Sequence, residues 1–428
     1  MLRRFVDVKE SEKGAVLWAF AYFFAILCGY YLLRPLRDEM GIRGGVTQIK
    51  WMVTATFAVM LLAVPAFSAV VARVPRRRII PVVYRSCAAM LVGFLVAERA
   101  GAPGAVLARV FFVWVSVFNL MVVSVFWSFL VDVFRSDQGK RLFGFVAAGG
   151  SAGAIAGPWI AGRLASTFGP ASLWLAAAAL LEAAVWCVRR LSRWAETNRS
   201  VGFAESAERP IGGGVWAGFR QSLASPYLLG ISGLLLCYSA TSTVAYQDQA
   251  GIVSASIRDS ASRTALFANV DLAVNAVALV LQGVVAGRLL ARGGLVIALA
   301  VLPVVTGAGY LALIASPGLA TLIGFQVIRR AAQYGLERPA REVLFTVVEP
   351  EAKYKAKNFI DTVVFRGGDA LSVWAYTGAR GAGLPAAAGW GMAAALSLAW
   401  LAGAVAMGRR QNTLARAQEA ARDRKEVA

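Results

Sequence analysis

The feature that most constrains this chain is a series of apolar segments, each about 20 residues long and almost free of charge. One such segment is long enough to cross the hydrocarbon core of a bilayer, which is about 30 Å thick. We count about twelve of them. They are 14–33, 51–72, 79–97, 105–131, 142–166, 170–188, 225–247, 264–290, 294–315, 318–337, 356–379 and 386–407. The sequence therefore predicts an all-α polytopic membrane protein.

Composition supports this class and excludes several functions. Hydrophobic residues make up 58% of the 428 residues and charged residues 16%, against about 45–50% and 25% in soluble domains. Histidine is absent, which excludes a histidine metal site, a Ser-His-Asp triad and a histidine proton relay. The phosphate loop G-x-x-x-x-G-K is also absent, so the chain cannot hydrolyse ATP by that route. We expect a protein that is not an enzyme and that holds no cofactor and no metal.

The formal net charge of +20 is unevenly distributed. Most of the 44 Lys and Arg residues lie in the two tails and in the loops that follow even-numbered segments. Because cytoplasmic loops carry an excess of Lys and Arg, both termini are predicted to be cytoplasmic. Runs such as Arg76-Arg77-Arg78 are then orientation signals and lipid contacts, with a dedicated ligand site as the alternative. We expect a multi-pass protein of the bacterial inner (plasma) membrane that binds no nucleic acid.

The predicted organisation has two halves. Residues 1–189 form a first six-helix bundle, 190–224 a cytoplasmic linker, 225–408 a second six-helix bundle and 409–428 a cytoplasmic tail. Two parallel bundles related by an axis along the membrane normal are expected from this arrangement. The first span is predicted to be a retained helix rather than a cleaved leader. All four cysteines fall within apolar spans, which predicts buried, reduced thiols.

The fifth span contains a regular series of small residues. Its pattern is G-x8-G-x3-G-P-x3-G, formed by Gly144, Gly153, Gly157, Pro158 and Gly162. Glycines let a neighbouring backbone approach closely, and proline bends a helix. The pattern resembles the antiporter motif in the fifth helix of the major facilitator superfamily, although a generic helix-packing face is the alternative. The loop at 72–78 does not match that superfamily's Asp-Arg-x-Gly signature.

Charged residues end the first span. Arg34, Arg37 and Asp38 share one face if the helix persists, and Pro35 is expected to open the backbone at Arg34. A charge at membrane depth usually faces a partner or a water-filled cavity. We therefore take these residues as candidates for substrate binding and gating. The alternative is an interfacial anchor whose arginines extend outward to water.

Two further spans carry isolated polar residues. Asp271 and Asn275 share a face of the eighth span, either lining a cavity as coupling residues or forming a ladder of hydrogen bonds between helices. Arg85 in the third span is a candidate for substrate binding or for a structural ion pair.

The eleventh span is the richest in charge. Lys357 and Asp361 are spaced to pair across one helical turn. Arg366 lies near the midplane, beside Asp369, and its planar fork of donors suits a carboxylate or phosphate. The alternative is a salt bridge from Arg366 to Asp361 or Asp369 that closes a cytoplasmic gate.

A second, narrower resemblance covers three stretches. The residues are Tyr334-Gly335-Leu336 with Arg341-Glu342 and Lys355-Ala356-Lys357-Asn358-Phe359-Ile360-Asp361 ending at Arg366, then Leu33-Arg34-Pro35-Leu36-Arg37-Asp38, and Lys140-Arg141-Leu142-Phe143. They are similar to the ATP/ADP translocases of intracellular bacteria and plastids, whose motifs include K-x-K-x-x-I-D-x-x-x-x-R and L-R-x-x-K-D. The resemblance implies a nucleotide-binding antiporter. The chain departs from it at Ala356 and Asn358-Phe359, so another nucleotide or a different anion is an equal alternative.

These observations predict a secondary transporter of an organic anion, with nucleotide exchange or another phosphorylated metabolite as the specific case, working by alternating access. The candidate substrate-binding residues are Arg34, Arg37, Arg85, Tyr334, Lys357 and Arg366, and the coupling or gating residues are Asp38, Asp271, Asn275, Asp361 and Asp369. A proton-coupled exporter of small amphipathic molecules, using Asp271 or Asp361, is the first alternative. A membrane receptor or scaffold that transports nothing is the second. The oligomeric state is left open.

Overall fold

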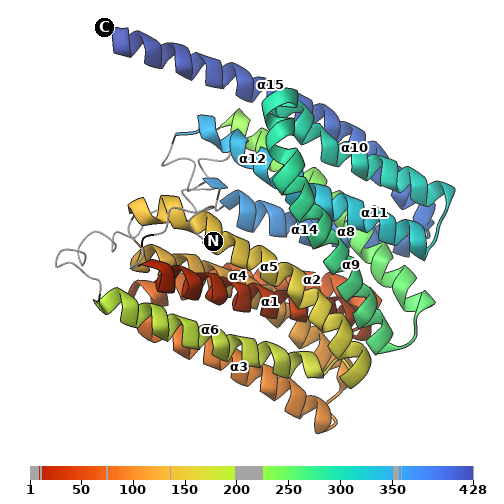
Figure 1. Cartoon of the computed structure of the whole chain (residues 1–428). Helices are drawn as coiled ribbons and strands as arrows, with labels where there is room; N and C mark the ends of the chain where they lie inside the picture. Colours follow the sequence, from red (N-terminus) through yellow and green to blue (C-terminus); the bar gives the residue numbers. More distant parts are fainter. Residues whose placement is uncertain are drawn as a thin grey trace. The chain divides into compact units, whose positions relative to one another are not determined.

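The computed structural model describes the backbone of residues 9, 12–73, 76–134, 136–197, 225–349, 356–357 and 359–427. Among these residues every regular element is helical (Figure 1). The α-helices are α1 (Lys13–Arg43), α2 (Ile49–Arg73), α3 (Arg76–Arg99), α4 (Gly104–Val133), α5 (Ser136–Phe168), α6 (Ser172–Thr197), α8 (Pro226–Ser256), α9 (Ser260–Val280), α10 (Gly294–Ala315), α11 (Leu319–Ala332), α12 (Arg338–Leu344), α14 (Phe365–Gly381) and α15 (Ala386–Val427).

Ten helices in the described part of the chain are long and apolar enough to cross a membrane. The predicted spans 318–337 and 356–379 are helical as well, but they are not among the ten. Charged residues such as Arg329, Glu337 and Arg366 lower their mean hydropathy. The prediction of an all-α polytopic membrane protein is confirmed.

The chain divides into two compact units. The first unit comprises Met1–Ile211 and Ile257–Leu272, and the second comprises Gly212–Ser256 and Ala273–Ala428. The division falls inside α9, so the first part of this helix packs with the first unit and the remainder with the second. The two units are described separately below.

Aromatic side chains fill the core of the first unit. The ring of Phe23 on α1 stacks on Phe126 of α4 with centroids 4.1 Å apart. Next to this pair, the hydroxyl groups of Tyr22 and Tyr84 are 2.6 Å apart and share a hydrogen bond away from water. Offset aromatic pairs of this kind stabilise a core beyond the area that they bury. The stacking fixes α1 against α3 and α4.

Glycines bring α1 and α5 into backbone contact, and the two helices run side by side in Figure 1. A Cβ atom built on Gly153 would lie 2.5 Å from the carbonyl oxygen of Phe24, and one on Gly157 would lie 2.6 Å from that of Cys28. No side chain fits at either position, because backbone atoms cannot move aside as side chains can. Gly144 differs from these two glycines, since a Cβ atom there would meet nothing within 4 Å.

Two prolines lie inside helices of this unit. Pro158 lies within α5, and Pro35 lies within α1, which continues without a break to Arg43. The expectation that the backbone opens at Arg34 is therefore wrong. Because α1 persists beyond residue 33, its charged residues belong to the helix itself and not to a loop after it.

Ion pairs join α1 to its neighbours at both ends. At the N-terminal end, Arg141 Nη2 lies 3.1 Å from Glu12 Oε1, and Gln138 donates a hydrogen bond to the same oxygen. Burial alone would raise the pKa of Glu12, but hydrogen bonds from Gln138, the Lys9 backbone and Arg141 hold it below its usual value. At the other end, Arg43 Nη1 lies 2.5 Å from Glu98 Oε1 on α3.

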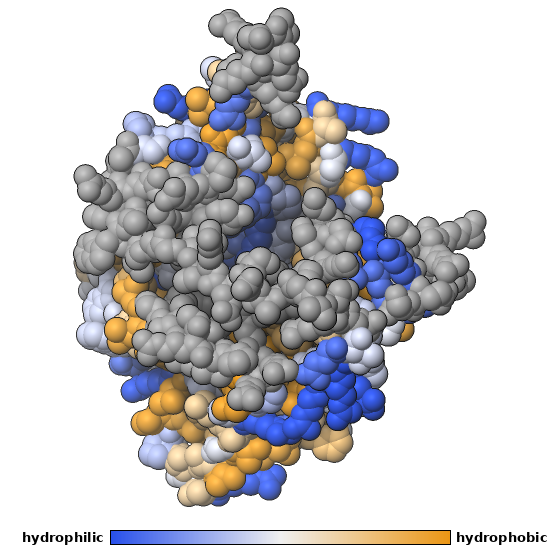
Figure 2. Space-filling view, turned by 90° about the vertical axis from the view of Figure 1, so that its left-hand side faces the viewer, coloured by the Kyte–Doolittle hydropathy of each residue, from blue (hydrophilic) through white to orange (hydrophobic). Residues whose placement is uncertain are grey.

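Figure 2 shows the molecule from the end at which α1 begins and α6 ends. Hydrophilic side chains gather at this end, beside apolar ones. Amphipathic ends of this kind are expected where helices leave a bilayer and meet water.

The second unit contains helical turns of a different kind. Its π-helical segments are Leu281–Ala286, Leu289–Gly293, Gln333–Glu337 and Ile360–Val364. Among the residues that the structure describes, all π-helical segments lie in this unit. A π turn widens the helix and is often found at functional sites.

The prediction of free thiols is confirmed, since all four cysteines are free. Cys28, Cys87 and Cys187 are buried in the first unit, and Cys237 in the second is half-buried. Several predicted features lie outside the described residues. These are the linker beyond residue 197, the segment 350–355 with Lys355, Asn358, and the side chains of Lys140 and residues 64–78.

Candidate functional site

An ion pair inside the first unit joins two of the residues selected from the sequence. Arg34 Nε on α1 lies 3.7 Å from Asp271 Oδ2 on α9. The side chain of Arg34 is 13% exposed and that of Asp271 is 1% exposed. The guanidinium also faces the ring of Tyr31, with Cζ 5.8 Å from the ring centroid. The pair connects a helix from the first half of the sequence to one from the second half.

A second ion pair joins the same two helices. Arg263 donates from Nε and Nη2 to the two carboxylate oxygens of Glu39, at 2.5 and 2.8 Å. Glu39 is fully buried, and Arg263 also donates to the backbone carbonyls of Ile257 and Arg258. This bidentate pair was not selected from the sequence. Glu39 follows directly after Asp38, but its partner is 224 residues away along the chain, and no local spacing could identify it.

Arg37 and Asp38 are neighbours in sequence and partners in the structure. Arg37 Nη2 lies 2.8 Å from Asp38 Oδ1, and Cζ of Arg37 lies 5.2 Å from the ring centroid of Phe112. Asp38 is buried, so this carboxylate is held within the unit rather than in water. About two turns of α1, at residues 34–39, and about two turns of α9, at residues 263–271, thus carry acids and bases together.

The remaining candidates associated with these helices lie in different surroundings. Asn275 is buried one turn after Asp271 on α9, so the two residues share a helix face as predicted. Arg85 on α3 is 48% exposed and pairs with Glu182 on α6 at 3.1 Å. The structure does not bring Arg85 together with Arg34, and its geometry matches the structural ion pair that was the alternative for this residue.

Arg366 and Asp369 lie together on α14 in the second unit. Arg366 Nη1 is 3.6 Å from Asp369 Oδ2, and Ser239 on α8 donates a hydrogen bond of 2.6 Å to Asp369 Oδ1. Gly368 lies beside Ser239, where a Cβ atom would meet its side chain. Arg366 therefore has an acidic partner on its own helix.

Lys357 makes a different ion pair from the one expected. Its Nζ lies 2.6 Å from Glu342 Oε2, and its charge also acts on Asp361, which is exposed. Asp361 lies in the π-helical segment Ile360–Val364. Tyr334 is half-buried, and the guanidinium of Arg338 lies 4.7 Å from its ring centroid.

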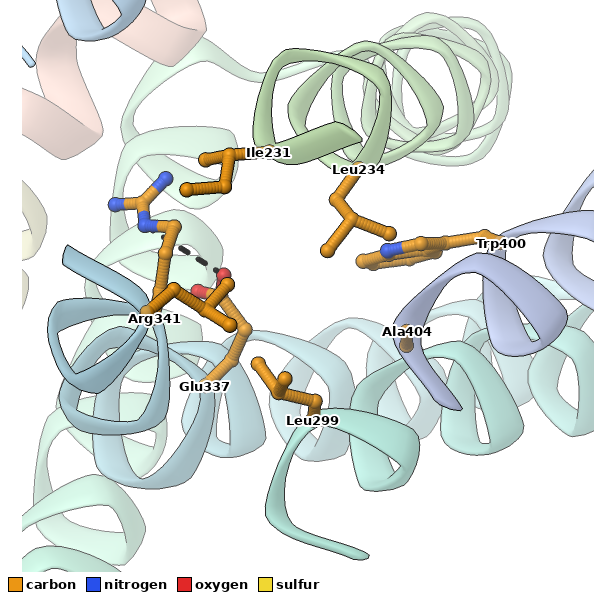
Figure 3. Close-up of a pocket in the computed structure, with 8 residues that line it drawn as sticks. Ile231, Leu234, Leu299, Glu337, Arg341, Trp400 and Ala404 are labelled. Atoms are coloured by element: carbon orange, nitrogen blue, oxygen red, sulfur yellow. Dashed lines mark ion pairs between the residues drawn. The ribbon is translucent and has the colours of Figure 1, made fainter. Parts of the chain in front are cut away.

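A small cavity lies close to these residues in the second unit (Figure 3). Glu337 and Arg341 form an ion pair of 3.7 Å on one side of it, and Trp400 lies on the other side. Apolar side chains complete the lining; they are Ile231, Leu234, Leu299, Leu344 and Ala404. The space has room for little more than a water molecule.

Two groups of buried polar residues in the second unit were not selected from the sequence. In the first, Asp248 on α8 accepts a hydrogen bond of 2.5 Å from the hydroxyl of Tyr376 and one of 2.8 Å from the indole of Trp390. Asp248 is 7% exposed, and it forms no ion pair with any residue that the structure describes. The predicted span ends at residue 247, whereas α8 continues to Ser256.

The second group surrounds Arg329 on α11. This arginine is 4% exposed, and it donates to Ser242 Oγ at 2.7 Å and to Gln326 Oε1 at 3.0 Å. Arg330, which follows it, is also buried. Both lie within the predicted span 318–337, so their position inside an apolar segment was the signal that could have identified them.

The comparisons with known proteins concern the fold. No family profile matches the sequence, and no curated protein matches it either. A bacterial homolog of the human lysosomal transporter Spinster, in an inward-facing and unoccupied conformation, is 14% identical, with 96% of this chain and 98% of that chain covered and a TM-score of 0.56.

Two other solved structures are similar over nearly their whole length. A bacterial homologue of the iron transporter ferroportin is 12% identical, with 94% and 98% covered and a TM-score of 0.62. A nucleoside transporter is 13% identical, with 94% and 99% covered and a TM-score of 0.57. These are transporters of the major-facilitator type. The chain therefore has the major-facilitator-like fold of two six-helix bundles that the sequence predicted.

Proposed function

We propose that this protein is a secondary transporter, not an enzyme, and that it carries an organic anion across the membrane by alternating access. A nucleotide or another phosphorylated metabolite is the proposed substrate. The fold supports transport, since the similar structures are transporters by their titles and one carries nucleosides. The stretches that resemble ATP/ADP translocases support a nucleotide.

The observation that carries this proposal is the ion pair of Arg34 with Asp271. Arg34 lies about two and a half turns from the C-terminal end of α1, well within the helix. Charged residues at membrane depth are costly and mark the paths of substrates and ions. An arginine presents a planar fork of donors that matches a carboxylate or a phosphate. An anionic substrate can therefore take the place of Asp271 beside Arg34.

This arrangement is compatible with exchange. When the substrate leaves, Arg34 needs an anion beside it, because an unpaired guanidinium at this depth is unfavourable. Either Asp271 or a second substrate provides it. In the second unit, Arg366 and Lys357 supply further positive charge, while Asp369 and Glu342 neutralise them in the absence of substrate.

The test is counterflow in liposomes that contain the purified full-length protein. The liposomes are loaded with an unlabelled anion (ATP, ADP, AMP, glucose 6-phosphate or citrate), and the uptake of the labelled compound is measured. The variant Arg34→Gln removes the positive charge, and the double variant Arg34→Gln/Asp271→Asn removes both charges of the pair. Arg288→Gln is the matched control, because Arg288 is exposed and its side chain donates a hydrogen bond to the Val284 carbonyl on its own helix turn.

We expect exchange of at least one phosphorylated anion in the wild-type protein and in Arg288→Gln. Both Arg34 variants should lose about 10- to 100-fold of the uptake, which corresponds to one charge-assisted hydrogen-bonding partner. The proposal is wrong if no anion exchanges. It is also wrong if the double variant, correctly folded, exchanges as fast as the wild type.

One observation favours a second function, a proton-coupled exporter of small amphipathic molecules. Asp248 is a buried carboxylate held by the neutral donors Tyr376 and Trp390, and the charge of Arg380 acts on it. Such a carboxylate can take up and release a proton during transport. In this case a pH gradient drives uptake of a lipophilic cation, and Asp248→Asn abolishes that uptake. If uptake of the lipophilic cation does not depend on the pH gradient, this function is ruled out.

A further inference from the structure

Arg329 is a buried cation whose partners are all neutral. Its two terminal nitrogens donate to the hydroxyl of Ser242 and the amide oxygen of Gln326, and its Cζ lies 5.9 Å from the ring centroid of Phe325. Its Nε is buried and has no acceptor. Among the residues that the structure describes, no carboxylate forms an ion pair with it. One donor and one full charge are therefore uncompensated.

Two less buried arginines in the first unit, each 13% exposed, provide a comparison. Arg34 has Asp271 as its partner and Arg263 has Glu39, both carboxylates. A cation that is removed from water without a counter-charge is strongly unfavourable. Residues of this kind persist inside membrane proteins where they serve a function. A ligand that brings a negative charge would compensate Arg329.

The surroundings hold the guanidinium in a fixed orientation. Gln326 donates from Nε2 to Gln249 Oε1 at 2.5 Å and to the Ala245 carbonyl at 3.3 Å, so its own oxygen is directed to Arg329. On the other side, Ser242 lies on α8. Side chains that are locked by second hydrogen bonds give a binding site its geometry before the ligand arrives.

The position of Arg329 along its helix also suits a substrate site. It lies about 15 Å from the start of α11 at Leu319. This is half the thickness of a hydrocarbon core, which is about 30 Å. Transporters of this architecture hold their substrates near the midplane. A lipid headgroup, by contrast, lies at the membrane surface.

We propose that Arg329, Ser242 and Gln326 form an anion-binding site in the second unit that takes a phosphate or carboxylate group. The inference rests on the proposed function, because the transported anion is the ligand. The anionic group accepts hydrogen bonds from Nε of Arg329 and from the hydroxyl of Ser242. Since Arg329 is almost completely buried here, α8 and α11 must separate for the group to enter.

The experiment is thermal unfolding of the full-length protein in lipid nanodiscs. Sodium chloride, sodium phosphate and ATP are compared at equal ionic strength, with the wild type, Arg329→Gln, Arg329→Lys and the control Arg288→Gln. We expect phosphate or ATP, but not chloride, to raise the unfolding temperature of the wild type and of Arg288→Gln. Arg329→Gln should weaken this binding about 10- to 100-fold, and Arg329→Lys, which keeps the charge but not the fork, should weaken it less.

A second readout separates a binding role from a structural one. Without added anion, Arg329→Gln should unfold at the same temperature as the wild type or a higher one, since an uncompensated charge has been removed. A lower unfolding temperature together with an unchanged response to phosphate and ATP would show that Arg329 is structural. If Arg329→Gln does not fold, the response to phosphate and ATP is compared between Arg329→Lys and the wild type instead.

The remaining outcomes distinguish this site from the proposed function. If the response survives in both Arg329 variants and is lost in Arg34→Gln/Asp271→Asn, this inference is overturned while anion transport stands. If no anion stabilises the wild type, both are overturned. An equal response to chloride would overturn the assignment of the site to phosphate or carboxylate groups.

Discussion

The two units differ in how they hold charge among their helices. In the first unit, half-buried arginines pair with buried carboxylates, as Arg263 does with Glu39 and Arg34 does with Asp271. In the second, Arg329 is held by a hydroxyl and an amide, and Asp248 by a phenol and an indole. Paired charges are compensated in the protein itself. Charges with neutral partners stay available to a ligand or a proton.

The helices of the two units also differ in packing and in regularity. In the first unit, the glycines of α5 lie against the backbone of α1, which allows no displacement without a clash. In the second, π-helical segments interrupt the α-helices that carry Tyr334 and Asp361. We infer that the first unit is the more rigid body, and that substitutions there affect stability more than ligand response.

The largest expected effect tests the paired charges of the first unit. Arg263→Ala leaves Glu39 buried without its partner and should destabilise the protein by about 3–5 kcal/mol. The matched change Arg85→Ala breaks a pair that is about half exposed, with Glu182, and should cost about 0–1 kcal/mol. Thermal unfolding in detergent measures both. Similar losses in the two variants would contradict the view that buried pairing sets the stability of this unit.

The next effect tests the contact between α1 and α5. Gly153→Ala places a Cβ atom against the Phe24 carbonyl and should destabilise the protein by about 1–3 kcal/mol. The Cβ atom of Gly144→Ala, on the same helix, has no neighbour within 4 Å. This variant should stabilise the protein by about 0.5–1 kcal/mol, because alanine is more favourable than glycine inside a helix. Opposite shifts in unfolding temperature are the expected result. A stabilising Gly153→Ala would mean that the two helices are not in backbone contact.

The smallest effect concerns pH. Because the pKa of Glu12 is lower in the folded protein than in the unfolded chain, its ionised form stabilises the fold. This stabilisation, about 1 kcal/mol or less, is complete above the usual pKa of glutamate and is lost as the pH falls through the lowered value. The difference in unfolding temperature between wild type and Glu12→Gln should therefore change little above pH 4.5, the usual pKa of glutamate, and shrink as the pH falls below it. If the difference between the two unfolding temperatures does not change with pH, ionised Glu12 does not stabilise the fold.

The sequence predicts the fold well because hydropathy alone identifies spans. It places Arg34, Asp38 and Asp271 inside helices that face partners, but not the pairing of Arg34 with Asp271, since that pairing depends on how α1 and α9 pack. Arg85 has the same sequence signal as Arg34 and lies on an exposed face. Periodicity cannot distinguish the two without the neighbouring helices.

The residues that sequence reasoning missed have a common cause. Asp248 follows Tyr246-Gln247, where falling hydropathy ends the predicted span, although hydrogen bonds keep these polar residues inside α8. Arg329 and Arg330 lie inside a predicted span but before the motif from Tyr334 to Arg366, so no motif marks them. Lys357 forms its ion pair with Glu342, which is 15 residues away along the chain and could not be identified from helical spacing.

The distribution of the free thiols has a practical consequence for labelling. The three cysteines of the first unit are buried and shielded from a water-soluble maleimide, whereas Cys237 is partly exposed. Replacing that single residue with serine would leave a background in which an introduced cysteine is the reactive thiol. Reporters for fluorescence or spin labelling could then be placed on α8 and α11, to follow their separation when an anion is added.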